Sequence, residues 1–346
     1  MADKNQMNLR YDLKKSLWKI LKSKEIVLIA ISVIVVLVFR LVNPHYLSLG
    51  SLNGIMQAMS ITGIIAVGIS ALLIGGSIDL SASQVSLFAG VICALLMQAG
   101  VPWGFAVIIT LICGACFGMV NAFLITKVGM MAFIATIAVG NVLSGVNMTI
   151  TRGQQVPVTV QSFWWGGKSL FGALPYPFLI MVILMVVYGL ILNYTQFGRN
   201  IYLVGGNQAA ARLTGVNPVK VRAILYINNS VLASAAGIVL LSRMQTASPQ
   251  SQRDAQMEAI TAAILGGIAF TGGAGGMTGC FIGVLLFSFF NSGLQSLALD
   301  TFWSQIASGL LLIVALTVDF FNTRSREKSL RIRMNQDSAV AKEVGR

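Results

Sequence analysis

Charged residues are scarce in this chain: they make up 10% of its 346 residues, whereas soluble domains carry about 25%. The single histidine, His45, leaves no histidine cluster for a metal and no second base for a Ser/His/Asp triad. All four cysteines lie in apolar runs without zinc-ligand partners: Cys93, Cys113, Cys116 and Cys280. We therefore expect no catalytic residue, no metal site and no cofactor-binding site.

Long uncharged apolar runs, by contrast, fill most of the chain, and short polar links separate them. A helix of about 20 apolar residues crosses a bilayer, whereas a transmembrane barrel would need alternating strands, which are missing. The sequence predicts an all-α polytopic membrane protein with about ten transmembrane helices. Their predicted ranges are 26–42, 54–75, 80–99, 103–126, 132–150, 176–194, 224–242, 257–271, 277–297 and 302–319, the eighth being short enough for a partial or broken span.

Basic residues are distributed unevenly and give the chain a net charge of +13. Seven lie in residues 1–25 and seven in residues 320–346, and neither tail carries a nucleic-acid motif. We expect both tails in the cytoplasm against anionic lipid, with the bilayer and not nucleic acid as their partner. This orientation also puts most basic loop residues inside, namely Lys127, Arg199, Arg212, Lys220 and Arg222, and leaves five outside, namely Arg40, Arg152, Lys168, Arg243 and Arg253.

The chain therefore divides into three predicted regions. Residues 1–25 form a basic cytoplasmic segment in which leucines at helical spacing favour an amphipathic helix on the inner leaflet. Residues 26–319 form the transmembrane domain, and residues 320–346 form a basic cytoplasmic tail. The first apolar run lacks a cleavage site after it, so we interpret it as a retained helix.

Two polar loops interrupt the transmembrane domain. The outer loop, 151–175, contains GGKS, but Ser162 stands where a P-loop needs glycine, so we exclude an ATP site. The inner loop, 195–223, is basic and has no acidic residue. Ala209–Leu213 can form a short helix there, which Gly215 and the Asn217–Pro218 pair would end. Such a loop is either solvated at the inner leaflet or gripped by a partner.

Residues 257–283, MEAITAAILGGIAFTGGAGGMTGCFIG, are rich in glycine. No GK[ST] follows and no βα unit begins here, so phosphate binding is not expected. The spacing instead favours a tight turn and close helix packing, and a moving hinge is the alternative. The glycines concerned are Gly266, Gly267, Gly272, Gly273, Gly275, Gly276, Gly279 and Gly283.

Asp79 is the most informative acidic residue, because it lies at the predicted start of a span with Ser81 close by. It can cap a helix and shape a gate, and a proton relay is a weaker alternative. Uncharged amides within the spans suit a pathway for a neutral polyol, and equally join helices. The gate or pathway candidates are Asp79, Ser81, Gln57, Asn121, Asn141 and Asn228.

Three segments, taken in order, resemble the permease subunits of bacterial ABC importers for monosaccharides, the ribose-type family. LLIGGSIDLSASQVSLFAG (72–90) is similar to the family's GG-x-DLS segment. GRNIYLVGGNQAAARLTGVNPVKVR (198–222) is similar to its G-x-N-x-x-A-A-x-x-x-G loop, and EAITAAILGGIAFTGGAGGMTGCFIGV resembles its E-x-I-A-A run with later glycines. Order and spacing match from about residue 45 to 320.

The resemblance implies a homodimeric core in the bacterial inner membrane. A second permease copy, a cytoplasmic ABC ATPase and an extracytoplasmic sugar-binding protein would be the partners, and ATP hydrolysis would occur in the ATPase and not in this chain. The 198–222 loop would hold the coupling helix. Its expected ATPase contacts are Gly206, Asn207, Ala210, Ala211, Arg212 and Gly215.

Three alternatives remain at this point. A branched-chain amino-acid ABC permease shares distant features with the ribose-type family. A stand-alone ion-coupled secondary transporter would need charges in mid-membrane, whereas Asp79, Asp300 and Asp319 lie near predicted span ends. An integral-membrane enzyme would need clustered acids or histidines, which a single histidine does not supply.

Overall fold

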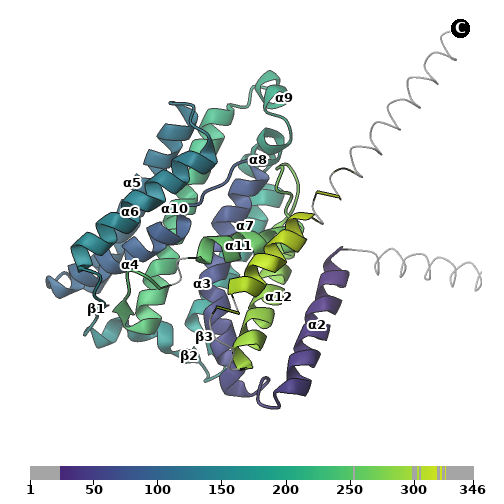
Figure 1. The fold of residues 1–346 in the computed structure, drawn as a ribbon. Coiled ribbons are helices and arrows are strands. Elements are labelled where there is room, and N and C mark those ends of the chain that lie inside the picture. The colour runs from purple at the N-terminus through teal and green to yellow at the C-terminus, as the bar shows by residue number, and fades with distance from the viewer. Residues whose placement is uncertain are drawn as a thin grey trace, which may run out of the picture.

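The computed structural model describes residues 24–251, 254–297, 302–303, 305–317, 320–321 and 324. This part of the chain is almost entirely helical, and the helices run side by side in one bundle (Figure 1). The predicted amphipathic helix within residues 1–25 and nearly all of the 320–346 tail lie outside the described residues.

Seven helices in the described part are long and apolar enough to cross a membrane. They are α2 (Lys24–Val42), α3 (Leu49–Ile74), α5 (Trp103–Thr126), α6 (Ala132–Thr151), α7 (Tyr176–Tyr194), α10 (Pro218–Met244) and α12 (Met277–Ser296). Three apolar helices are shorter: α4 (Ala82–Gln98), α11 (Ala255–Leu265) and Gln305–Thr317. The prediction of an all-α polytopic membrane protein is confirmed, and the number of crossings stays a prediction.

Helices α3 and α10 form the centre of the bundle. The most apolar 18-residue window is 89% buried in α3 and 72% in α10, against 28% in each of α5, α6 and α7. Small residues bring the neighbours of α10 close to its backbone. A Cβ on Gly118 of α5 would lie 2.5 Å from the Cα of Ile227, and one on Gly90 of α4 would lie 3.4 Å from the carbonyl oxygen of Gly237. In lipid, such close backbone approach is a main source of helix association.

The outer helices leave an apolar surface uncovered. Large side chains such as Leu41 of α2, Phe105 of α5 and Phe133 of α6 are exposed. Helix α2 packs against α12, and Asn43 just beyond α2 donates a hydrogen bond to the carbonyl of Ser296 over 3.2 Å. An exposed apolar belt of this kind suits hydrocarbon, because lipid tails are as apolar as leucine.

The two ends of the bundle differ in structure (Figure 1). At the α9 end, α8 (Gln196–Gly206) and α9 (Gln208–Leu213) connect α7 to α10. At the strand end, β1 (Val156–Pro157) pairs with β4 (Thr246–Ala247), and β2 (Ser169–Leu170) pairs with β3 (Leu174–Pro175), both antiparallel. A 3₁₀ helix, η1 (Gln161–Gly167), lies between β1 and β2.

Two of the short helices begin inside the bundle, after non-helical segments. Residues 75–81 lead from the end of α3 to α4, and the described residues 248–251 and 254 lie between β4 and α11. The predicted extent of the eighth span, 257–271, is wrong, because α11 has 11 residues and ends at Leu265. Irregular backbone at membrane depth is tolerated only where protein or water surrounds it. Both segments thus mark the part of the fold where function is expected.

Candidate functional site

The carboxylate of Asp79 lies at the centre of a buried hydrogen-bond cluster in the 75–81 segment. Asp79 is 0% exposed. One carboxylate oxygen accepts from the backbone amide of Ser81 at 2.8 Å and from its hydroxyl at 2.6 Å, and the other accepts from the side-chain amide of Asn229 at 2.9 Å. The Asn121 amide donates to the Ser81 hydroxyl at 2.8 Å. The cluster therefore joins the segment to α5 and α10.

The helix cap at this position is Ser81 and not Asp79. Ser81 is the N-cap residue of α4 and makes no side-chain cap hydrogen bond, while Asp79 bonds the Ser81 amide from outside the helix. Two more bonds hold the segment: the Leu80 amide donates to Thr136 at 3.0 Å, and the Tyr226 hydroxyl donates to the Ile78 carbonyl at 3.0 Å. The structure thus fixes the irregular backbone on three sides.

The other predicted pathway residues lie elsewhere. Gln57 of α3 accepts from the Arg243 guanidinium at 3.0 Å, and Asn228 of α10 accepts from the Tyr188 hydroxyl. Asn141 is exposed on the surface of α6. The structure therefore brings together Asp79, Ser81 and Asn121, and adds Asn229, but it does not place Gln57, Asn141 or Asn228 among them.

A junction of glycines connects three distant segments at the α9 end. The Gly273 amide donates to the Ile74 carbonyl at 2.8 Å. A Cβ on Gly272 would lie 2.8 Å from the Cα of Gly76 and 2.9 Å from the oxygen of Gly205. Gly272 and Gly273 both have positive φ, at 90° and 71°, a conformation that glycine adopts without strain. The junction therefore requires glycine at three places: in α8, just after α3 and in the 266–276 loop.

The remaining glycines of the 266–283 stretch divide between turn and packing. A Cβ on Gly279 or Gly283 of α12 would strike the backbone at Gly266 or Ala262, so these two positions bring α12 against α11. Gly272 and Gly275 lie in the loop before α12 and not in a helix. Their four-residue spacings to Gly276 and Gly279 therefore do not bring two helices together, contrary to the prediction from the sequence. The tight turn occurs, with Gly267 and Gly275 also at positive φ.

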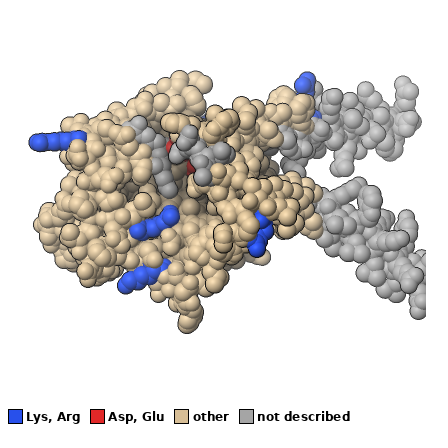
Figure 2. Space-filling view, turned by 60° about the horizontal axis from the view of Figure 1, so that its bottom comes forward, with Lys and Arg blue, Asp and Glu red and all other residues tan. Residues whose placement is uncertain are grey.

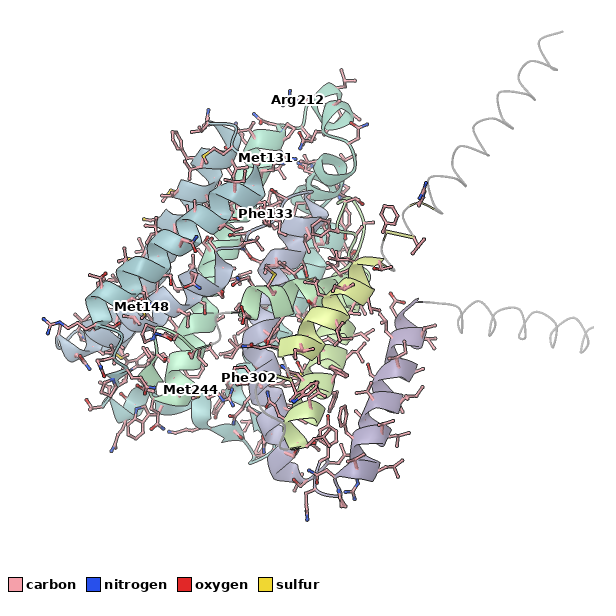
Figure 3. The ribbon with its side chains drawn as sticks, in the orientation of Figure 1. Met131, Phe133, Met148, Arg212, Met244 and Phe302 are labelled. Carbon is pink, nitrogen blue, oxygen red and sulfur yellow. The ribbon has the colours of Figure 1, made fainter. Side chains whose placement is uncertain are left out.

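Helices α8 and α9 form the outermost surface at the α9 end, with Arg212 at its tip (Figure 3). The predicted short helix is confirmed as α9, but α8 was missed, and its cap Thr195 accepts from the Gly198 amide at 3.0 Å. Asn207 caps α9 by accepting from the amides of Ala209 and Ala210 at 2.9 and 3.0 Å.

Five of the six predicted coupling residues are exposed on this surface: Gly206, Asn207, Ala210, Arg212 and Gly215. Ala211 is the exception, because it is 1% exposed and packs against the body of the bundle. The surface is also tied to the glycine stretch. The Tyr202 hydroxyl of α8 donates to the Gly275 carbonyl at 2.8 Å, and burial raises the pKa of Tyr202, so the donor proton is retained.

A family model for the permease component of branched-chain amino acid transport systems matches residues 51–316. The chain belongs to this permease family. The resemblance to ribose-type importer permeases is also confirmed. The permease is 33% identical over 296 residues to the ribose import permease protein RbsC of Escherichia coli, covering 84% of this chain and 92% of the relative.

Further relatives extend this similarity. The Bacillus subtilis RbsC protein is 32% identical over 288 residues, 83% of the permease and 89% of the relative. The L-arabinose transport system permease protein AraH of Escherichia coli is 30% identical over 283 residues, 82% of the permease and 86% of the relative. No solved structure matches the chain. Homologues of this kind are transporter subunits, so the permease is not itself expected to be an enzyme.

Sequence reasoning missed one polar contact in the bundle interior. Glu258 of α11 accepts a hydrogen bond from the Thr62 hydroxyl of α3 at 3.2 Å. The predicted eighth span placed Glu258 at its end, at the membrane surface. The shortness of the predicted eighth span is the signal that could have identified Glu258. Interrupted helices in transporters end near the middle of the bilayer, so polar residues at such an end lie deep in the bundle.

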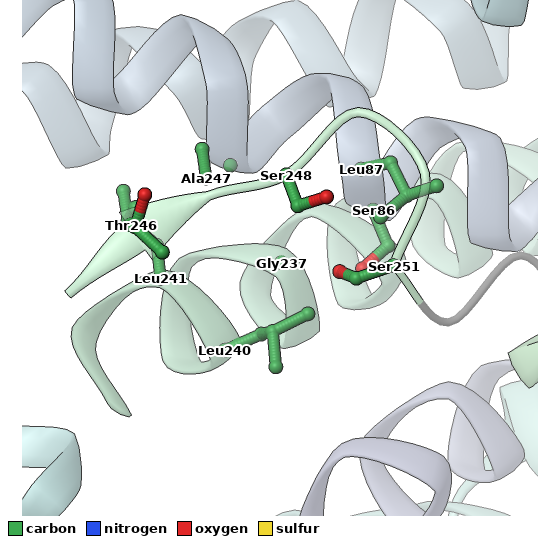
Figure 4. Close-up of a pocket in the computed structure, with 10 residues that line it drawn as sticks. Ser86, Leu87, Gly237, Leu240, Leu241, Thr246, Ala247, Ser248 and Ser251 are labelled. Atoms are coloured by element: carbon green, nitrogen blue, oxygen red, sulfur yellow. The ribbon is translucent and has the colours of Figure 1, made fainter. Parts of the chain in front are cut away.

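A small hollow lies against the segment that leads into α11 (Figure 4). It encloses about 230 Å³ including its open mouth, between α4, α10 and residues 246–251. Four hydroxyl side chains line it: Ser86, Thr246, Ser248 and Ser251.

Proposed function

We propose that the chain is the membrane-spanning subunit of an ABC importer for a monosaccharide such as a pentose or hexose. The order of the three motifs over most of the chain carries this proposal. The named functions of its relatives, ribose import and L-arabinose transport, support a sugar over an amino acid. The pathway candidates are uncharged amides and hydroxyls, which hydrogen-bond a neutral polyol without requiring a counter-ion.

The proposed topology has ten crossings and both termini in the cytoplasm of a bacterial cell. The seven long helices cross singly, and the three short apolar helices complete ten crossings together with the segments before them. The α9 end then faces the cytoplasm, where the basic residues gather, in agreement with the positive-inside rule. The strand end faces outward, where a sugar-binding protein would dock.

In the proposed cycle, α9 transmits movement from a separate ATPase. Its exposed small residues would fit a groove on the ATPase, and two copies of the chain would flank one pathway. The glycine junction then links α8 to the 75–81 segment and to the loop before α12 through backbone contacts. Packed backbone of this kind moves as a unit and does not deform gradually, which suits a switch between two states.

Reconstitution into liposomes tests the proposal. Uptake of labelled D-ribose, L-arabinose, D-glucose and leucine is measured with and without the ATPase and binding protein from the same source. Sugar uptake that requires ATP and both partners is the expected result. Leucine uptake under the same conditions would indicate an amino-acid permease. Uptake by this chain alone, driven by a proton or sodium gradient, would make it a secondary transporter.

A further inference from the structure

Glu258 lies near the middle of the bundle. Its partner Thr62 is about 20 Å along α3, whose 26 residues extend for about 39 Å at 1.5 Å per residue. The carboxylate reaches this depth because α11 has only 11 residues and begins at Ala255, inside the bundle. An ionisable side chain at such depth is costly in a membrane and usually serves function.

The surroundings of Glu258 leave it partly open to the strand end. Glu258 is half-buried, while Met257 and Asp254 of the same segment are exposed, as is Ala58 of α3. Seen from the strand end, the permease has a recess in which acidic side chains are visible (Figure 2). Among the described residues no ion pair is formed, so Glu258 has no cationic partner there. Its carboxylate keeps free capacity to accept hydrogen bonds.

A second polar pair lies on another side of α3, nearer the strand end. Gln57 is about 12 Å along α3 and accepts from Arg243, a half-buried residue in the last turn of α10. Gln57 and Thr62 are five residues apart, about 140° around a helix of 3.6 residues per turn, so Gln57 points toward α10 whereas Thr62 points toward α11. The guanidinium and the amide of this pair can also hydrogen-bond hydroxyl groups, but on a different side of α3 from Glu258.

We propose that Glu258 contacts the transported sugar: its carboxylate accepts hydrogen bonds from hydroxyl groups of a neutral monosaccharide that enters from the strand end. Thr62 positions the carboxylate. This proposal rests on the proposed function and adds a point of sugar selection within the permease itself. A site that hydrogen-bonds a hydroxyl discriminates strongly against a substrate that lacks it.

The test compares native permease with Glu258→Gln in the reconstituted importer, at saturating binding protein. The first probe is whichever of D-ribose, L-arabinose and D-glucose the native importer takes up fastest. The other probes are the monodeoxy analogues of that sugar. For the intact sugar, Glu258→Gln is expected to lower the initial uptake rate by about ten-fold or more, the scale of one hydrogen bond to a charged group. For the analogue that lacks the contacted hydroxyl, native and variant rates are expected to be equal.

Asp254→Asn is the matched control, because it removes the same charge from an exposed position four residues earlier. It should leave the ratio of sugar to analogue uptake unchanged. A Glu258→Gln variant that transports all sugars at the native rate, or that slows intact and deoxy sugars equally, overturns this proposal alone. A native permease that takes up no sugar with both partners overturns the proposed function and this proposal with it. Detergent-purified variants that elute like the native protein show that folding is preserved.

Discussion

The backbone amide of Gly273 donates a hydrogen bond to the carbonyl of Ile74 over 2.8 Å, although 198 intervening residues separate them in the chain. Ile74 is the last residue of α3, so its carbonyl would otherwise be one of the unpaired groups at a helix end. The loop before α12 thus completes the end of the central helix. Gly205 of α8 lies against the same carbonyl, which places the outer α8–α9 surface in direct contact with the bundle core.

The first prediction concerns Gly205. A Cβ added here would strike the Ile74 carbonyl and would lie 2.8 Å from the Gly273 amide nitrogen, both of them backbone atoms that cannot rotate away. Gly205→Ala is therefore expected to destabilise the permease by about 1–3 kcal/mol, the usual cost of overpacking. The measurement is the thermal unfolding midpoint in detergent, together with ATP-driven sugar uptake.

Gly206→Ala is the control for Gly205. It adds the same methyl group one residue later, where the nearest atom to the new Cβ outside α8 and the residue that follows it, the Cα of Gly273, is 4.0 Å away. Its unfolding midpoint should match that of the native protein. Equal loss in both variants would mean that the contacts of Gly205 at the junction do not explain the effect, since alanine is the better helix former of the two residues.

The second prediction concerns the buried carboxylate of Asp79. Asp79→Ala leaves the Ser81 amide and the Asn229 side-chain amide without their acceptor, and each buried unpaired donor costs about 1–3 kcal/mol. Asp79→Asn keeps one acceptor oxygen and is expected to lose less stability. Thermal unfolding of both variants, in native and Asn229→Ala backgrounds, gives a double-mutant cycle. Additive losses would show that Asp79 and Asn229 do not interact.

Most residues of the Asp79 cluster were predicted from the sequence, whereas their depth in the bundle was not. Hydropathy and charge located most helices, because a bilayer requires long apolar runs and orders basic residues by side. They could not show that α4 and α11 begin inside the bundle, since this depends on how the residues before each helix pack against the rest of the chain. Glu258 was missed for this reason. Asn229 was not among the predicted gate or pathway residues, because its pairing with Asp79 joins residues far apart in the chain.

The α8–α9 surface shows the same limit. Gly215 and the Asn217–Pro218 pair correctly predicted the end of α9, whereas α10 begins at Pro218, six residues before the predicted start of the seventh span. Helix α8 was taken as loop, although Phe197, Ile201 and Val204 face the core at helical spacing. The polar residues between them, Arg199 and Asn200, masked this pattern in a hydropathy scan, because a surface helix needs only one apolar face.

The third prediction concerns the cap of α9. Asn207→Ala removes the acceptor for two amides and should destabilise this short helix by about 1 kcal/mol. Because α9 lies at the surface, we expect global stability to change little and ATP-driven uptake to fall. Asn207→Asp keeps a capping oxygen and should restore uptake. Co-purification of the ATPase with each variant measures the interaction directly. Equal uptake by Asn207→Ala and the native permease would show that α9 does not take part in coupling to the ATPase.

The fourth prediction concerns the orientation of the bundle. Phe171 at the strand end is 96% exposed, and Leu213 at the end of α9 is 91% exposed. In a chain whose four cysteines are replaced by alanine, Phe171→Cys should react with a membrane-impermeant maleimide on intact cells. Leu213→Cys should react only after the cells are permeabilised. The reason is that the basic residues of the 195–223 region hold the α9 end on the cytoplasmic side.

Labelling at both ends also tests the number of crossings. Helices α2 and α3 are joined at the strand end, so the start of α2 must lie on the same side as α9. A cysteine added at the N-terminus should therefore react like Leu213→Cys, and one added at the C-terminus should do the same if the number of crossings is even. Reaction of only one terminus on intact cells would require an odd number, and the Gln305–Thr317 helix would then not cross the membrane.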